Sequence, residues 1–290
     1  MYYLKLAGKC ARASVQAELA YRANFWLALF QSLLGLGTGI AGVLVLFGQV
    51  ESIRGWDLAS TLALLGVFLI LSALRGLFIG PSLEALAGMD GEVWTGRLDY
   101  TLLRPVNPQF LASVRHWRPF ALVDLALGIG VVAVAAGRLG AALPLDRLAA
   151  FFLALGAAVT ILYAAMLAFC ALTLWNPSLL FTWILDGLFD MARYPVGLYP
   201  GWLRLVLTWI VPVGLMTTVP AQALMGSLPA AALAGSVAFA VALFAGARRL
   251  FRLGLRRSAG ASGCGRGGPA GPGGLTPRPG GAGSLAPHRR

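Results

Sequence analysis

The residues that could carry chemistry in this chain are mainly charged side chains inside or beside apolar segments. Arg75, Asp124, Asp186 and Asp190 lie within or next to runs of hydrophobic residues. A charge at membrane depth is a candidate for ion or proton transport. Close to the end of an apolar helix, however, a charged side chain pairs locally or extends to the membrane surface. Because Arg75 and Asp124 lie near such ends, we favour a structural role for them over a proton relay.

Residue types that enzymes use for nucleophilic or metal chemistry are scarce. The sequence has two histidines, His116 and His288, and three widely spaced cysteines, Cys10, Cys170 and Cys264. This spacing gives neither a disulfide framework nor a metal-binding pattern. The sequence also lacks a phosphate-binding loop, a nucleophile elbow and an H-E-x-x-H sequence. We therefore predict a chain that is not an enzyme, binds no cofactor or metal, and does not hydrolyse ATP by itself.

The composition predicts a membrane protein. Hydrophobic residues make up 58% of the 290 residues and charged residues 12%, whereas soluble domains are about 25% charged. The net charge is +12, but the basic residues cluster at the ends of apolar segments and near the C-terminus, without a basic stripe interleaved with aromatic residues. This placement is typical of contact with anionic lipid and argues against nucleic acid as a partner.

The apolar segments predict an all-α polytopic membrane protein with six transmembrane helices in residues 23–250. About 20 helical residues cross the hydrocarbon layer of a bilayer. Five segments have this length and lie at 24–47, 58–79, 119–137, 148–174 and 228–247. Gly80-Pro81 predicts the end of the second segment, and Asn176-Pro177 predicts the end of the fourth.

Residues 177–225 allow two interpretations of the remaining span. Hydropathy alone favours a helix at 203–224, although Pro212 and Pro220 would each remove a backbone donor from it. The alternative is a short fifth span at 177–193, which would contain Asp186 and Asp190. In that case two half-length helices would follow and fold back at Pro212. Both interpretations leave the C-terminus on the same side of the membrane.

The two ends of the chain differ from the apolar segments. Residues 1–22 mix Lys5, Lys9 and Arg12 with apolar positions, which predicts an amphipathic helix lying in the membrane interface. Residues 251–290 form a basic tail rich in glycine and proline. From residue 258 this tail has almost no large apolar side chain, so we predict that it is disordered.

The distribution of Lys and Arg predicts the orientation in the membrane. These residues concentrate before the first span, in the loop 81–118 and after the last span, whereas the opposite loops contain only Arg54, Arg138 and Arg147. Cytoplasmic segments of membrane proteins carry the excess of positive charge. We therefore predict a multi-pass protein of the cell (inner or plasma) membrane with both termini in the cytoplasm.

The loop 81–118 contains the most specific local pattern, which predicts a short amphipathic helix ending at Arg104-Pro105. Leu98 and Leu102 are four residues apart and would share one face. Such a helix could dock into a partner protein, or it could simply lie on lipid. The residues that we predict for docking are Trp94, Gly96, Arg97, Leu98, Asp99, Leu102, Arg104 and Pro105.

Two stretches of the chain resemble one branch of the ABC-2 type permeases, the membrane subunits of ATP-binding-cassette exporters. The first is Gly96-Arg97-Leu98-Asp99 followed by Leu103-Arg104-Pro105-Val106-Asn107-Pro108, and the second extends over 193–221. Together with the six-span layout, the resemblance covers residues 1–250.

The resemblance implies a division of labour between subunits. Two permease subunits, identical or not, would form the path for an unidentified exported substrate, and separate ATPase subunits would bind ATP and Mg. The segment 81–110 would be the coupling helix that the ATPase contacts, and residues 1–22 would be the interface helix. A re-entrant hairpin would fall on 196–225, which favours a fifth span at 177–193.

Two other functional classes remain as alternatives. A secondary transporter or channel would need charges at the middle of the bilayer to bind a coupling ion, and few charges lie that deep in this sequence. A membrane-embedded enzyme would need catalytic motifs, which the sequence lacks. We therefore favour a permease subunit that acts with a second permease subunit, an ABC ATPase and membrane lipids.

Overall fold

The computed structural model describes residues 2–19, 22–88, 91–103, 105–138, 144–176 and 181–264. Within these residues the chain forms helices and no strand, apart from an isolated antiparallel bridge between Ile53 and Trp56. The prediction of an all-α fold is therefore confirmed.

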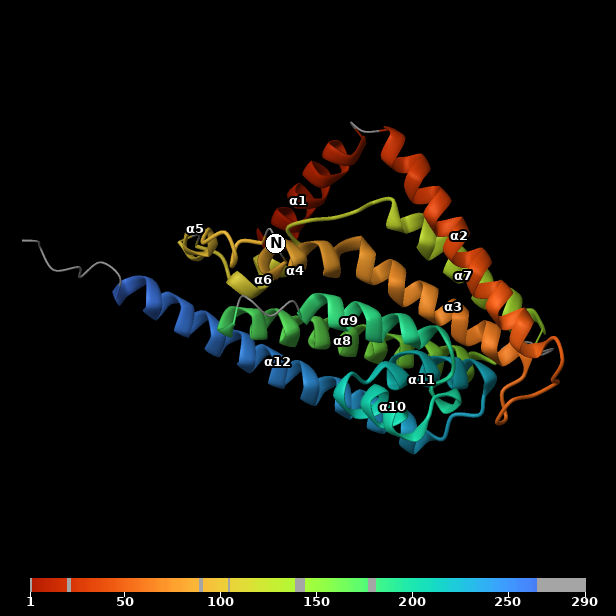
Figure 1. The fold of residues 1–290 in the computed structure, drawn as a ribbon. Helices are drawn as coiled ribbons and strands as arrows, with labels where there is room; N and C mark the ends of the chain where they lie inside the picture. Colours follow the sequence, from red (N-terminus) through yellow and green to blue (C-terminus); the bar gives the residue numbers. More distant parts are fainter. Residues whose placement is uncertain are drawn as a thin grey trace, which may run out of the picture.

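Five helical segments in the described part are long and apolar enough to cross a membrane. They contain α2 (Arg22–Phe47), α3 (Leu58–Leu74), α7 (Ala121–Arg138), α8 (Leu145–Trp175) and α12 (Ala230–Cys264). Figure 1 shows α3, α8 and α12 running roughly alongside one another through the length of the molecule. One bent pair of helices lies before the last of these segments. Together with this pair, the five segments confirm the prediction of a polytopic membrane protein.

The second span is longer than its sequence predicts. After α3 the chain makes a π-helical turn at Arg75–Ile79 and continues as α4 (Gly80–Ala87), so that one segment of 30 residues extends over Leu58–Ala87. We predicted an end at Gly80-Pro81. The helix continues through Pro81 because the carbonyl of Leu77, four residues earlier, accepts a hydrogen bond of 2.8 Å from the backbone nitrogen of Arg118 in place of the missing N–H.

The ambiguous region forms short helices and not a straight span at 203–224. Helix α9 (Phe181–Asp190) has 10 residues and rises about 15 Å, roughly half the thickness of the hydrocarbon layer. After 3-10 turns at Met191–Arg193 and Val196–Leu198 come α10 (Gly201–Leu205), a π turn at Val206–Ile210 and α11 (Val213–Met225). The axes before and after Pro212 differ by 84°. The re-entrant hairpin remains a prediction.

The core lies where α8 packs against α11 and α12, and where α3 packs against α7 and α11. Glycines allow α3 and α7 to approach closely. A Cβ atom on Gly66 would lie 2.7 Å from Val132 Cγ2, and one on Gly128 would lie 2.9 Å from the backbone nitrogen of Ile70. Small residues at contacts are the usual means of close helix packing in membranes.

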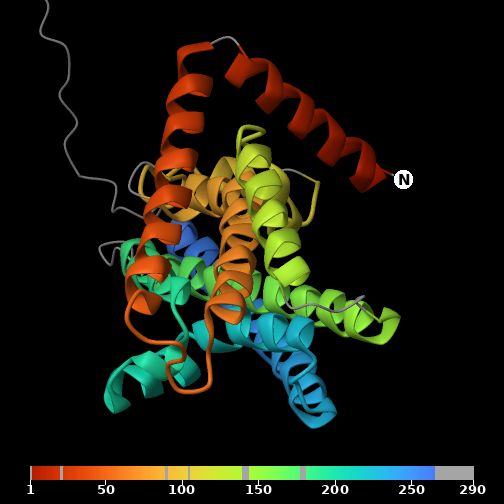
Figure 2. The same cartoon turned by 90° about the vertical axis from the view of Figure 1, so that its right-hand side faces the viewer.

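Helix α2 stands at the edge of the bundle. Its large apolar side chains, among them Trp26, Phe30 and Val45, are exposed in the isolated chain. Figure 2 shows α1 (Tyr2–Leu19) and α2 meeting at an angle, with α1 projecting away from the other helices. Lipid or another protein chain must therefore cover much of α2.

Helix α1 also contacts the loop between α4 and α7. The rings of Tyr3 and Phe110 meet edge to face with centroids 4.8 Å apart. Further along α1, the hydroxyl of Ser14 accepts a hydrogen bond of 3.2 Å from the backbone nitrogen of Trp117. These contacts give α1 a protein partner in addition to the membrane surface that we predicted for it.

The C-terminal helix extends beyond the predicted start of the tail. We predicted no structure from residue 251, whereas α12 continues to Cys264. Phe251 is fully buried, and a Cβ atom on Gly254 would lie 3.0 Å from Leu174 Cδ1. The first turn of the predicted tail is therefore packed against the end of α8, and residues 265–290 lie outside the described part of the chain.

Candidate functional site

The predicted coupling loop lies at one end of the helix bundle. Figure 1 places α4, α5 (Leu98–Leu102), α6 (Pro108–Val114) and the C-terminal part of α12 at this end, and α10 and α11 towards the other. The loop follows directly from α4, so its position is set by the long helical segment that begins at Leu58.

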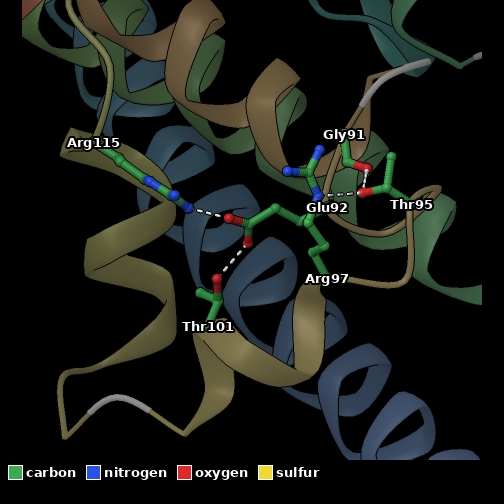
Figure 3. Close-up of polar contacts among 6 residues, drawn as sticks. All are labelled: Gly91, Glu92, Thr95, Arg97, Thr101 and Arg115. Atoms are coloured by element: carbon green, nitrogen blue, oxygen red, sulfur yellow. Dashed lines mark hydrogen bonds and ion pairs between the residues drawn. The ribbon is translucent and has the colours of Figure 1, made fainter.

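The side chain of Glu92 bonds to two separate parts of the loop (Figure 3). One carboxylate oxygen forms an ion pair with Arg115, and the other accepts a hydrogen bond of 2.5 Å from the hydroxyl of Thr101. The side chain of Glu92 is 14% exposed and that of Arg115 is 33% exposed. The backbone of Glu92 also bonds to Ala85 at 3.0 Å and to Leu98 at 3.2 Å. The carboxylate of Glu92 thus links α5 to the end of α6 through charge-assisted bonds, and the backbone of Glu92 connects the loop to α4.

A tight turn precedes α5. Both the backbone nitrogen and the hydroxyl of Thr95 donate to the carbonyl of Gly91, at 3.0 Å and 2.9 Å. The guanidinium Nε of Arg97 donates to the Thr95 hydroxyl at 3.3 Å (Figure 3). Gly96 has φ +70°, a conformation that glycine adopts without strain. The turn therefore has a defined shape that depends on a glycine at position 96.

Four side chains form the outer face of the loop: Trp94, Arg97, Tyr100 and Leu103 are all exposed. The exposed fractions are 57% for Trp94, 72% for Tyr100 and 81% for Leu103. Aromatic and arginine side chains are enriched in protein interfaces. The outer face therefore has the composition of a docking surface.

The predicted docking residues divide between the inside and the outside of the loop. We predicted one helix from Trp94 to Arg104, but the helix is α5 alone. Leu98 is 5% exposed and Leu102 is partly buried, and both pack on the chain's own core. Trp94, Gly96, Arg97 and Pro105 are exposed. The side chain of Asp99 and the whole of Arg104 lie outside the described residues.

The structure brings two of the predicted intramembrane charges together. Arg75, in the π turn, forms an ion pair with Asp186 of α9. Its guanidinium also lies 5.4 Å from the centre of the Phe189 ring, which stacks on Phe68 at 5.4 Å. The guanidinium of Arg193 lies 5.4 Å from the centre of the Phe68 ring. These contacts between two arginines and two phenylalanine rings join the second span to α9 and the turn that follows it.

The other two predicted charges, Asp124 and Asp190, line a cleft of about 440 Å³. Residues of α2, α3 and α7 form most of its lining, with Asp190 and Arg193 contributed by the end of α9 and the turn that follows. Within the described part of the chain, no group of three or more acidic, histidine or cysteine side chains could hold a metal ion.

Comparison with known families is decisive for the class of protein. The model of the ABC-2 family transporter protein matches residues 33–262. The chain belongs to this family. No curated protein and no solved structure matches the chain.

Membership of the ABC-2 family confirms the resemblance seen in the sequence. This ABC-2 protein is a multi-pass membrane protein and a transporter membrane subunit, not an enzyme. The matched residues include the predicted coupling loop, all four charges predicted to lie in the membrane and most of α12, whereas α1 and the start of α2 precede the match.

Sequence reasoning missed several residues that organise this ABC-2 chain. Glu92 and Arg115 carry opposite charges within one loop, which is a weak signal for an ion pair. Phe68, Phe189 and Arg193 have no local pattern that connects them, because they meet only when α9 folds against α3.

Proposed function

We propose that this ABC-2 chain is the permease subunit of an ATP-driven exporter. In this proposal a separate ABC ATPase binds ATP and Mg, and a second permease subunit completes the translocation path. The exposed apolar surface of α2 is available for that second subunit, because Trp26 and Phe30 are 68% and 62% exposed in the single chain.

The observation that carries the proposal is the loop with its outer face. A surface that transmits force must keep its shape, and here Glu92 supplies an ion pair and a hydrogen bond that fix the loop internally. Trp94 and Tyr100 remain exposed on the outside. The ATPase would contact this outer face.

The path for transmission would begin at the loop and follow the second span. The loop continues from α4, and α4 continues from the π turn that contains Arg75. Arg75 in turn pairs with Asp186 of α9. A displacement of the loop would therefore reach α9 through one helical segment and one ion pair.

The orientation is part of the proposal. The C-terminal part of α12 is rich in arginine, with Arg248, Arg249 and Arg252, and this part of the helix lies at the same end of the molecule as the loop (Figure 1). Arg248 lines one pocket together with Asn107 and Gln109 of the loop. An excess of positive charge favours the cytoplasmic side. The loop and both termini would therefore face the cytoplasm of a cell whose inner or plasma membrane holds the protein.

Co-purification tests the proposed docking surface. The full chain is co-expressed with an ABC ATPase subunit from the same genome, and the complex is isolated through a tag on the permease. We expect Trp94→Ala and Arg97→Glu each to reduce the recovered ATPase at least about tenfold, since anchor residues at interfaces contribute about 2 kcal/mol or more. Arg138→Glu, an exposed charge at the far end of α7, serves as the matched control.

The same preparations distinguish docking from folding. All three variants should retain the Tm of the original protein in detergent, because their side chains are exposed. Full recovery of the ATPase with both loop variants would exclude the outer face as its docking site. ATP hydrolysis by the permease alone would contradict the division between subunits.

A further inference from the structure

The cleft between α2, α3 and α7 is large enough for a ligand. Its volume is about 440 Å³, within the range of roughly 300–1,000 Å³ found for small-molecule sites. Charged and aromatic side chains share its lining, and those that matter for its chemistry are Glu18, Phe68, Arg118, Asp124, Asp190 and Arg193.

The positive charges of the cleft already have partners. Arg118 interacts electrostatically with Glu18, and the guanidinium of Arg193 lies over the ring of Phe68. The second oxygen of Glu18, Oε2, is buried without a hydrogen-bond partner. The lining therefore contains a carboxylate oxygen that can still accept a hydrogen bond, whereas both of its arginines already interact with other side chains.

Asp190 is a carboxylate of the lining that belongs to no ion pair among the described residues. It is the last residue of α9 and is exposed towards the cleft, and the negative end of a helix dipole disfavours a carboxylate. Its side chain makes no capping hydrogen bond to the turn that follows. Asp186, one turn earlier, adds a like charge but is itself paired with Arg75.

Asp124 adds a second carboxylate to the same cleft. It lies in the first turn of α7, where the helix dipole favours an acid. Among the residues that the structure describes, neither Asp124 nor Asp190 belongs to an ion pair. With Glu18 included, the acids of the lining outnumber the arginines by one. Uncompensated carboxylates in a site partly walled by apolar side chains require a positive counter-charge.

We propose that the cleft binds an amphiphilic organic cation. The cationic group lies near Asp124 and Asp190, and the apolar part lies against Phe68 and the adjoining Leu36 and Leu69. An anion would meet unpaired carboxylates, and a neutral molecule would leave them uncompensated. The inference rests on the proposed export function, for which such a cation is the cargo.

Binding of two ions of the same shape and opposite charge tests the proposal. The full chain is placed in nanodiscs of zwitterionic lipid and equilibrated by dialysis with tetraphenylphosphonium or tetraphenylborate, and binding to protein-free nanodiscs is subtracted. We expect saturable binding of the phosphonium and no saturable binding of the borate. Asp190→Asn should weaken phosphonium binding about tenfold, because a hydrogen-bonded or paired charge contributes about 1.5 kcal/mol or more.

Matched variants separate the site from the overall charge of the chain. Asp190→Glu keeps the carboxylate and should retain phosphonium binding, and Asp124→Asn should weaken it. Asp146→Asn removes an exposed acid from the first turn of α8, away from the cleft, and should bind as the original chain does.

Saturable binding of the borate with similar affinity, or unchanged phosphonium affinity in Asp190→Asn and Asp124→Asn, would overturn the proposal. The assay needs neither ATP nor the ATPase. Its failure would therefore leave the proposed permease role standing, and loss of ATPase docking would leave this binding result standing.

Discussion

At the scale of single residues, the ion pair of Glu92 with Arg115 is the contact that fixes the loop. We predict that Glu92→Gln lowers the Tm of the purified protein in detergent, because the amide cannot neutralise Arg115, which is 33% exposed. The loss corresponds to about 1–3 kcal/mol for a charged hydrogen bond with one partner removed. ATPase recovery should fall as well, since the outer face loses its support.

Glu51→Gln is the matched control for that substitution, because Glu51 is exposed in the segment between α2 and α3. An unchanged Tm for Glu92→Gln would mean that the ion pair makes no net contribution to stability. Recovery of the ATPase would then have to depend on the outer side chains alone.

The pair of Arg75 with Asp186 should behave as one unit. We predict that Arg75→Gln and Asp186→Asn each lower the Tm, and that the double variant loses less than the two single losses added together. Removing one partner leaves the other charged within the bundle, and residues in contact couple by about 0.5–3 kcal/mol. Additive losses in such a cycle would contradict a direct pair.

The distant residues Arg97 and Asp146 supply a control cycle for this pair. Arg97 lies in the turn before α5 and Asp146 in the first turn of α8, and both are exposed, so Arg97→Gln and Asp146→Asn should combine additively.

The sequence identified the four intramembrane charges as candidates because charge is rare in apolar segments. It did not show that Arg75 meets Asp186, since that contact depends on how α9 folds back onto the second span. The sequence analysis also assigned Leu98 to docking. An apolar helical face can pack on the chain's own core or on a partner, and the sequence alone does not distinguish the two. The structure turns Leu98 inward.

At the scale of elements, the start of α3 depends on Asp57. Its carboxylate accepts a hydrogen bond of 2.9 Å from the backbone nitrogen of Ser60, and the Ser60 hydroxyl accepts one of 2.9 Å from the backbone nitrogen of Asp57. We predict that Asp57→Ala lowers the free energy of unfolding by about 1 kcal/mol. Asp57→Asn should cost less, because asparagine also caps helices.

The cap also predicts a dependence on pH. The hydrogen bond from the Ser60 hydroxyl is the main reason that the pKa of Asp57 lies below its usual range. The stabilisation is therefore present above the pKa of an unfolded aspartate, about 3.9, and is lost as the pH falls through the lower folded value. In Asp57→Asn this part of the acid sensitivity should disappear when Tm is measured across acidic pH.

The end of α12 makes a second prediction about elements. A chain ending after Arg257 should insert and retain most of its Tm, whereas one ending after Arg249 loses Phe251, which is fully buried. Phe251→Ala is expected to destabilise the protein by about 3–5 kcal/mol, the usual effect of emptying a buried phenylalanine site. Equal stability of the two shortened chains would contradict the packing of this turn against α8.

Long elements were predictable from sequence and short ones were not. The first, third, fourth and last apolar segments correspond to α2, α7, α8 and α12, because hydropathy and length suffice to identify them. The second span is longer than predicted because the carbonyl left open by Pro81, that of Leu77, is bonded by the backbone nitrogen of Arg118, a contact that the sequence does not reveal. The region from α9 to α11 was ambiguous because its helices are too short for a hydropathy signal.

At the scale of the whole molecule, the proposed coupling loop, its contacts with α1 and the C-terminal part of α12 lie at one end, while α10 and α11 lie towards the other end (Figure 1). The charged cleft is lined both by residues next to this loop, such as Arg118, and by residues of α9 and the middle of α3. Residues near the loop and residues of α9 therefore line the same cleft.

Labelling of single cysteines tests which end faces the cytoplasm. Ser52 lies in the segment between α2 and α3, and Thr95 lies in the loop, and both are exposed. In a background where Cys10, Cys170 and Cys264 are replaced by serine, we predict that an impermeant maleimide labels Ser52→Cys in intact cells. Thr95→Cys should react only after the membrane is opened, because the excess of Arg and Lys retains its end inside.

Thr95 suits this test better than Ser113 because Thr95 is an exposed residue, whereas Ser113 is only partly exposed and its hydroxyl lies 2.6 Å from that of Tyr163. A chain inserted in the opposite direction would give the reverse pattern, with Thr95→Cys labelled in intact cells and Ser52→Cys protected. That result would place the outer face of the loop outside the cell, beyond the reach of any ATPase supplied with cytoplasmic ATP, and it would exclude the proposed coupling role at once.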